Sequence, residues 1–246
     1  MSAQAPRSVV LVRPHRFTPN PLTAHDNRFQ TPAAGDVAEA AYRASTVAAQ
    51  RLRDAGVTVH LFEDETGAHP DSVFPNNWFS THGGGRVAVY PMYAANRRGE
   101  RRADVIDFLK HHYRVQEVID YSGMEQDGIY LEGTGAMVLD HSTRLAYAAR
   151  SRRADPLLLE RFCTTFGYEP MLFDAVDDDG TPIYHTNVMM CVATDFALIC
   201  LEAITDPARR AEIAERLTDS GKQVVDLSLA QVRSFAGNAL ELRGRT

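Results

Sequence analysis

The stretch HTNVMMCVATDFALICLEAI, residues 185–204, contains the pattern on which the fold depends. It begins with a short polar signature, continues as an apolar run, crosses a turn at Thr194 and Asp195, and returns as a second apolar run. Two apolar runs joined by a short polar turn are typical of a β-hairpin. The stretch therefore predicts a hairpin with polar side chains at its entrance.

The same pattern occurs earlier in the chain, as FPNNWFSTHGGGRVAVYPM at 74–92 and LEGTGAMVLDHSTRLAYAAR at 131–150. Its first half returns in SFAGNALELRGRT at 234–246. Aligning these segments places four residues in register at intervals of roughly 50 residues, a period typical of repeat architectures: Asn77, Gly135, Asn187 and Asn238. By this register the last unit should turn at Arg243 to Thr246 and return, so we expect the last unit to be incomplete and the chain to be truncated.

Helices are predicted between these segments by their end signals. DPLLLERFCTTFG at 155–167 and DPARRAEIAERLTDSG at 206–221 each begin with an Asp N-cap followed by Pro and end at Gly. Two further helices are expected at about 37–55, closed by Gly56, and at about 100–112. Each is followed by a short β-like run, so the predicted unit is a hairpin, a helix and a strand.

Units of this kind stack on one another to share a core, as in a propeller or another closed array. We therefore predict a single α/β domain over residues 1–246. A pseudo-symmetric ring would bring the polar signatures together around one axis, so the sequence predicts a central site.

Composition limits the function classes. The net charge of -6 and the pI near 5.8 argue against a nucleic-acid footprint, and small clusters at Arg97–Arg102 and Arg150–Arg153 suit a small anionic or zwitterionic ligand better. The apolar run Val9–Val12 is too short for a signal segment or a membrane span. We expect a cytoplasmic protein without nucleic-acid or membrane partners, and homo-oligomer formation is left open.

No metal or cofactor is predicted. The GGGR segment at 83–86 lacks the Lys-Ser/Thr of a phosphate loop and indicates a hairpin turn, and Asp177–Asp179 lack an EF-hand pattern. Cys163, Cys191 and Cys200 form an odd set without CxxC spacing. Their apolar surroundings predict free thiols with a raised pKa that do not act as nucleophiles.

The polar signatures supply the candidate site residues, and each has a simpler explanation. Glu132 could be a strand-edge carboxylate facing water, although the adjacent glycines would let a ligand approach closely. His185 and Asn187, two apart, would face the same side of a strand and could supply a base and a hydrogen-bonding amide. Asn77 could be part of an ordinary turn. Their shared register favours a common site.

The segments VFPNNWFSTH, YLEGTGAMVLD, YHTNVMMC and SFAGN, together with VRP at 12–14 and ANRRGERR at 95–102, resemble the amidinotransferase and arginine deiminase superfamily, the penteins. The similarity is strongest to the citrulline utilization hydrolases and covers the whole chain. This resemblance implies a five-bladed α/β propeller of ββαβ units, here with an incomplete last blade.

The resemblance also implies chemistry at the carbon of a guanidino or ureido group. In the family a cysteine attacks this carbon, with a His as acid and base and a supporting Glu, which correspond here to His185 and Glu132. The acidic residues that bind a guanidinium correspond to Asn77 and Asn187, and the arginines that hold a substrate carboxylate correspond to Arg97 and Arg150.

Two departures from the family pattern shape the functional expectation. Amides in place of carboxylates suit a neutral ureido group better than a cation, which favours citrulline, cleaved to ornithine, ammonia and carbon dioxide. The family's late, Gly-rich segment with the nucleophilic cysteine has no counterpart here, so we expect this chain to be inactive by itself. An amidinotransferase and a ligand-binding pentein without activity are the alternatives.

Overall fold

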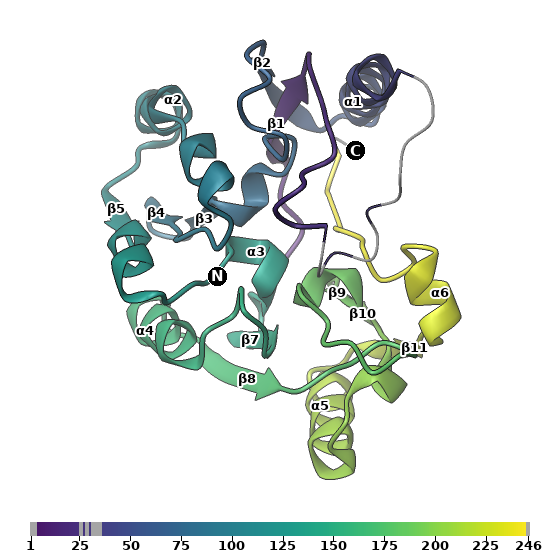
Figure 1. Cartoon of the computed structure of the whole chain (residues 1–246). Helices are drawn as coiled ribbons and strands as arrows, with labels where there is room; N and C mark the ends of the chain where they lie inside the picture. The colour runs from purple at the N-terminus through teal and green to yellow at the C-terminus, as the bar shows by residue number, and fades with distance from the viewer. Residues whose placement is uncertain (1–3, 25–26, 28–29, 31–35, 245–246) are drawn as a thin grey trace.

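The computed structural model describes residues 4–24, 27, 30 and 36–244. Small sheets stand around a centre occupied by the short helix α3 (Gly133–Ala136), with α1, α2, α4 and α5 at the periphery (Figure 1). The α/β class and the repeated unit predicted from the sequence are thus confirmed.

Three sheets have the same order, in which a hairpin is followed by a helix and by a strand parallel to the second hairpin strand. The first consists of β3 (Phe79–His82), β4 (Arg86–Val89), α2 (Ala103–Tyr113) and β5 (Glu117–Asp120). The second consists of β6 (Val138–Asp140), β7 (Leu145–Ala149), α4 (Pro156–Phe166) and β8 (Glu169–Phe173). The third consists of β9 (Met190–Val192), β10 (Phe196–Ile199), α5 (Pro207–Asp219) and β11 (Gln223–Asp226).

The fourth sheet pairs β1 (Ser8–Pro14) in parallel with β2 (Thr58–Asp64), connected by α1 (Val37–Asp54). The strands are in register from Ser8 opposite Thr58 to Pro14 opposite Asp64. After β11 the chain forms α6 (Leu229–Arg233) and then runs without regular structure to residue 244. The turn predicted at Arg243 to Thr246 falls partly outside the described residues.

The helix ends follow the predicted signals. The carboxylates of Asp155 and Asp206 accept hydrogen bonds from the backbone N–H of Leu157 and Ala208, which caps α4 and α5. Gly167 ends α4 with φ of 71°, a left-handed conformation that glycine adopts without steric cost.

The core lies between neighbouring units. Tyr147 of β7 and Met171 of β8 belong to one buried cluster with Met190 of β9 and Ile199 of β10. Units are also joined by polar contacts: Lys222 Nζ lies 2.8 Å from Oδ2 of Asp140, and both side chains are almost fully buried. Because each unit buries its apolar face against the next, the polar signatures at the strand entrances are held close to one another.

Candidate functional site

Each polar signature folds as one short helical turn directly before the first strand of a hairpin. These turns are η1 (Pro75–Asn77), α3 and η4 (Thr186–Val188). They are joined by hydrogen bonds from Thr186 Oγ1 to the carbonyl of Ala136 (2.6 Å) and from Thr134 Oγ1 to that of Asn76 (3.4 Å). The convergence predicted from the register is therefore present.

The prediction that His185 and Asn187 lie on one strand is wrong. His185 is extended at the N-cap of η4, and Asn187 lies within its turn. A spacing of two suits a strand, but here the chain turns before the strand begins at Met190. Both residues nevertheless line the same cavity.

Glu132 and His185 form a buried pair at the centre of the ring. Nε2 of His185 lies 2.8 Å from Oε2 of Glu132, while Oε1 accepts a hydrogen bond from the backbone N–H of Tyr93 (2.9 Å). Glu132 is fully buried and His185 is 6% exposed, so the simpler explanation of Glu132 as a water-facing carboxylate does not hold.

Burial and charge determine the protonation of this pair. Burial acts to raise the pKa of Glu132, but the hydrogen bond from His185 and the charges of Arg97 and Arg153 outweigh it and hold this pKa at about 2. Burial lowers the pKa of His185, although Glu132 opposes the change. The histidine is therefore neutral at neutral pH, with the proton on Nε2 facing the carboxylate and Nδ1 available to accept a proton.

Gly135 permits the close approach of two site residues. A Cβ on this glycine would lie 2.2 Å from the side chain of Asn77 and 2.9 Å from Nδ1 of His185. A Cβ on Gly133, whose φ is 45°, would lie 2.2 Å from the backbone oxygen of Asn76. These two positions require glycine because η1 and η4 pack directly on the backbone of α3.

Arg97 lies in a buried ionic network beside the pair. Its Nε and Nη2 each lie 2.9 Å from a carboxylate oxygen of Glu100. Oδ2 of Asp71 lies 3.4 Å from Nε of Arg97, and Oε2 of Glu132 lies 3.5 Å from its Nη1. Burial raises the pKa of Glu100 to about 7 despite the opposing charge of Arg97.

A cavity of about 450 Å³ opens over these groups, a size that suits a small molecule. Its wall contains His185, Asp71, Arg97 and Arg153. Side-chain amides are the most frequent lining groups: Asn20, Asn27, Gln30, Asn76, Asn77, Asn187 and Asn238. Four aromatic rings also line it: Phe17, Phe74, Tyr184 and Phe235. The cavity is thus rich in neutral hydrogen-bonding groups.

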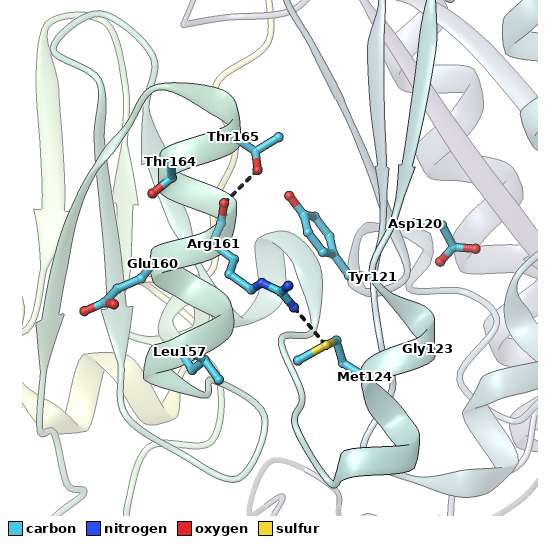
Figure 2. Close-up of a pocket in the computed structure, with 9 residues that line it drawn as sticks. All are labelled: Asp120, Tyr121, Gly123, Met124, Leu157, Glu160, Arg161, Thr164 and Thr165. Carbon is cyan, nitrogen blue, oxygen red and sulfur yellow. Dashed lines mark hydrogen bonds between the residues drawn. The ribbon is translucent and has the colours of Figure 1, made fainter.

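A larger hollow of about 640 Å³ lies at the outer rim, between α4 and the segment after β5. Figure 2 shows Arg161 donating to the sulfur of Met124 across this hollow, with Tyr121 beside it. Its lining includes no residue of the polar signatures. The cavity above the Glu132–His185 pair is therefore the candidate active site.

The structure does not bring every predicted residue into this cavity. Asn77, Asn187, Arg97 and His185 line it, whereas Arg150 is not among its lining residues. The Arg150 side chain is about half exposed, and its Nε lies 3.1 Å from Asp174. Arg150 thus lies apart from the other predicted residues.

Sequence reasoning missed Arg153, which is 2% exposed, lines the cavity and lies 3.5 Å from Glu132. The basic cluster Arg150–Arg153 indicated that this part of the chain contributes to the site, but not which of its arginines lines the cavity. Asn238 was aligned with the signatures but not assigned to the site. Its Nδ2 donates to the backbone oxygen of Asn187 at 3.1 Å.

The three cysteines of the sequence are all buried, and none of them lines the cavity. Burial raises the pKa of Cys163 to about 12 and that of Cys200 to about 11, and it also raises that of Cys191. This agrees with the prediction that these thiols do not act as nucleophiles.

Within the described residues, one group of three His, Cys, Asp or Glu side chains lies close enough together that it could hold a metal ion, namely Asp177, Asp178 and Asp179, and it does not line the cavity. No helix in the described part of the chain is long and apolar enough to cross a membrane.

Comparisons with known proteins identify the family and the fold. The family model described as N,N dimethylarginine dimethylhydrolase, eukaryotic, matches residues 13–246. The comparison with curated protein sequences gives no match.

Several solved structures share the fold. One is the apo structure of ArgZ, an arginine dihydrolase from the ornithine–ammonia cycle in cyanobacteria (TM-score 0.74, 17% identity, 96% of this chain and 33% of that chain). Another is AgrE in a ternary complex with ornithine and NAD+ (TM-score 0.73, 18% identity, 96% and 32%). A third is a dimethylarginine dimethylaminohydrolase adduct (TM-score 0.55, 13% identity, 94% and 96%). The present chain thus spans about a third of the length of ArgZ and AgrE, and its fold is that of the penteins.

Proposed function

This chain belongs to the N,N-dimethylarginine dimethylhydrolase family of the pentein superfamily, and from that premise we propose that its cavity serves C–N bond hydrolysis in a small guanidino or ureido compound. Citrulline, the neutral ureido amino acid, is the proposed substrate, with ornithine, ammonia and carbon dioxide as products. One water is consumed for each citrulline cleaved.

The observation that carries this proposal is the buried Glu132–His185 pair at 2.8 Å under an amide-lined cavity. Glu132 holds the imidazole with Nε2 protonated, so Nδ1 can take a proton from a nucleophile and later return it to the leaving amine. The histidine needs to be neutral to start this cycle, and its lowered pKa keeps it so at neutral pH.

The remaining cavity groups suit the two ends of a ureido amino acid. Asn187 offers an amide donor and acceptor to the ureido group, and Asn77 lines the same cavity. Arg153 is the better placed arginine for the α-carboxylate, because it lines the cavity whereas Arg150 does not, and Arg97 contributes positive charge beside it.

Covalent catalysis requires a nucleophile, and the family resemblance implies a cysteine thiolate. Attack on the ureido carbon would release ammonia, with its proton from His185. The carbamoyl–sulfur intermediate would then be hydrolysed through loss of ornithine and carbon dioxide. Since no cysteine of this sequence lines the cavity, we expect the 246-residue chain to bind the substrate without converting it. This favours the ligand-binding alternative over an amidinotransferase for the chain by itself.

Isothermal titration calorimetry with citrulline, arginine and dimethylarginine, together with an assay of ornithine release, tests the proposal. We expect saturable citrulline binding without ornithine release, and His185→Asn should weaken the binding. Turnover that persists when Cys163, Cys191 and Cys200 are all replaced by Ser would refute the proposed mechanism. Failure of all three ligands to bind a folded chain would refute the proposed substrate class.

A further inference from the structure

The side-chain amide of Asn77 has its orientation fixed by its neighbours. One of its two terminal atoms lies 3.0 Å from Nη1 and 3.2 Å from Nη2 of Arg97, and the other lies 3.2 Å from the amide of Asn76. A guanidinium group only donates hydrogen bonds. The atom facing Arg97 is therefore the carbonyl oxygen of Asn77, and its NH2 group faces Asn76.

Arg97 cannot easily turn to present a different face. Glu100 holds it through two parallel bonds of 2.9 Å, and Arg97 and Glu100 are 3% and 2% exposed. Such paired bonds fix the plane of a guanidinium as well as its position. Glu100 does not line the cavity, so it would position a ligand there through Arg97 and not by direct contact.

The orientation of Asn77 determines that of the next amide. Because the NH2 group of Asn77 donates, the atom of Asn76 that faces it must be the carbonyl oxygen. The NH2 group of Asn76 is then left to donate elsewhere, and Asn76 lies in the cavity wall. A chain of donors thus runs from Arg97 through Asn77 to Asn76.

We infer that Arg97, positioned by Glu100, directs this amide pair so that hydrogen-bond donors end at the cavity and select a ligand with an oxygen acceptor. A ureido group has such an oxygen, whereas a guanidinium has only donors and would face donors. Asp71, an anion that could attract a guanidinium, already accepts a bond from Asn20 at 2.7 Å and lies 3.4 Å from Arg97. This inference rests on the proposed function and names the chemical group that the same cavity prefers.

Calorimetry with citrulline and arginine tests the inference on four forms of the full chain. The wild-type protein should bind citrulline at least tenfold more tightly than arginine. Asn76→Asp, which replaces the terminal donor by an acceptor of the same size, should weaken citrulline binding at least tenfold and reverse the preference. Glu100→Gln should bring the ratio of the two dissociation constants at least fivefold closer to one.

Glu125→Gln is the matched control, because Glu125 binds Arg101 through both of its carboxylate oxygens but Arg101 does not contact the amide pair. It should leave the ratio within about twofold. A wild-type preference for arginine, or an unchanged ratio in both Asn76→Asp and Glu100→Gln, overturns the inference. Thermal unfolding of each variant separates these results from loss of the fold.

Neutron diffraction on crystals exchanged into heavy water distinguishes this inference from the proposed function. If neither ligand binds, the proposed function fails, but the amide orientation is still measurable. Deuterons on the Asn77 nitrogen that point toward Asn76 support the donor chain, and deuterons that point toward Arg97 overturn it.

Discussion

Substitution of Gly135 by Ala should damage the site through a single methyl group. The added Cβ would lie 2.2 Å from the side chain of Asn77, so this side chain would have to move by about 1 Å to restore ordinary contact. Arg97 and Asn76 hold the amide on its other sides, so the movement breaks hydrogen bonds with a charged partner. Such a bond is worth about 1.5–3 kcal/mol and overpacking costs about 1–3 kcal/mol, whereas Ala gains up to about 1 kcal/mol of helix propensity. We expect a net loss of about 1.5–5 kcal/mol in the free energy of unfolding.

The same substitution should weaken citrulline binding by more than tenfold, because it displaces Asn77 and crowds Nδ1 of His185. Urea unfolding followed by circular dichroism measures the first effect and calorimetry the second. Gly123→Ala is the matched control, since a Cβ there meets nothing within 4 Å and the backbone is not left-handed. A Gly135→Ala protein that unfolds and binds like the Gly123→Ala protein would refute the packing argument.

Three further substitutions test the electrostatics and the backbone. Burial lowers the pKa of the His82 imidazole to about 3. The unfolded chain therefore binds a proton here near pH 6.5 while the folded protein does not, so the stability from the neutral imidazole is complete above pH 6.5 and is lost as the pH falls toward 3. The loss in the free energy of unfolding between pH 6.5 and pH 4 is about 3 kcal/mol, and His82→Gln should remove this pH dependence. A difference in urea stability between the two proteins that does not change with pH would contradict this. Lys222→Met leaves the Asp140 carboxylate buried without its cation and should cost about 3–5 kcal/mol, and a midpoint of urea unfolding equal to that of the wild type would show that the pair is unimportant. Phe235 has φ of 63° and a side chain about half exposed. Phe235→Gly relieves about 1–2 kcal/mol of backbone strain but loses about 1–1.5 kcal/mol of ring burial. We expect the free energy of unfolding to stay within about 1 kcal/mol of the wild type, and a loss of about 2 kcal/mol or more would contradict the strain.

Local signals predicted the scaffold well, for a physical reason. An Asp N-cap followed by Pro, and a glycine with positive φ at the other end, determine helix ends through contacts within a few residues, as at Asp155 and Gly167. The hairpins likewise depend on turns and alternating runs close in sequence. The repeat then indicated which hairpins are equivalent, and therefore that their entrances meet.

The site was predicted less completely, because its details depend on residues far apart in the chain. Glu100 is three residues from Arg97, but the other partners of Arg97 come from positions 71, 77 and 132, which no local pattern links to it. Of the arginines in the 150–153 cluster, the sequence pointed to Arg150, but Arg153 is the one that is buried against Glu132. The spacing of His185 and Asn187 suggested a strand because residues two apart lie on one face of a strand, but residues 186–188 form a helical turn.

The cost of this buried charge favours a functional explanation for it. Glu132, Arg97 and Glu100 are each at most 3% exposed, and removing charges from water costs several kcal/mol per ion, which pairing repays only in part. Apolar residues of similar volume would usually stabilise such a centre equally well or better. They could not accept the hydrogen bond that fixes the imidazole of His185, nor fix the direction of the Asn77 amide. The arrangement is therefore better explained by the binding and activation of a polar ligand than by stability.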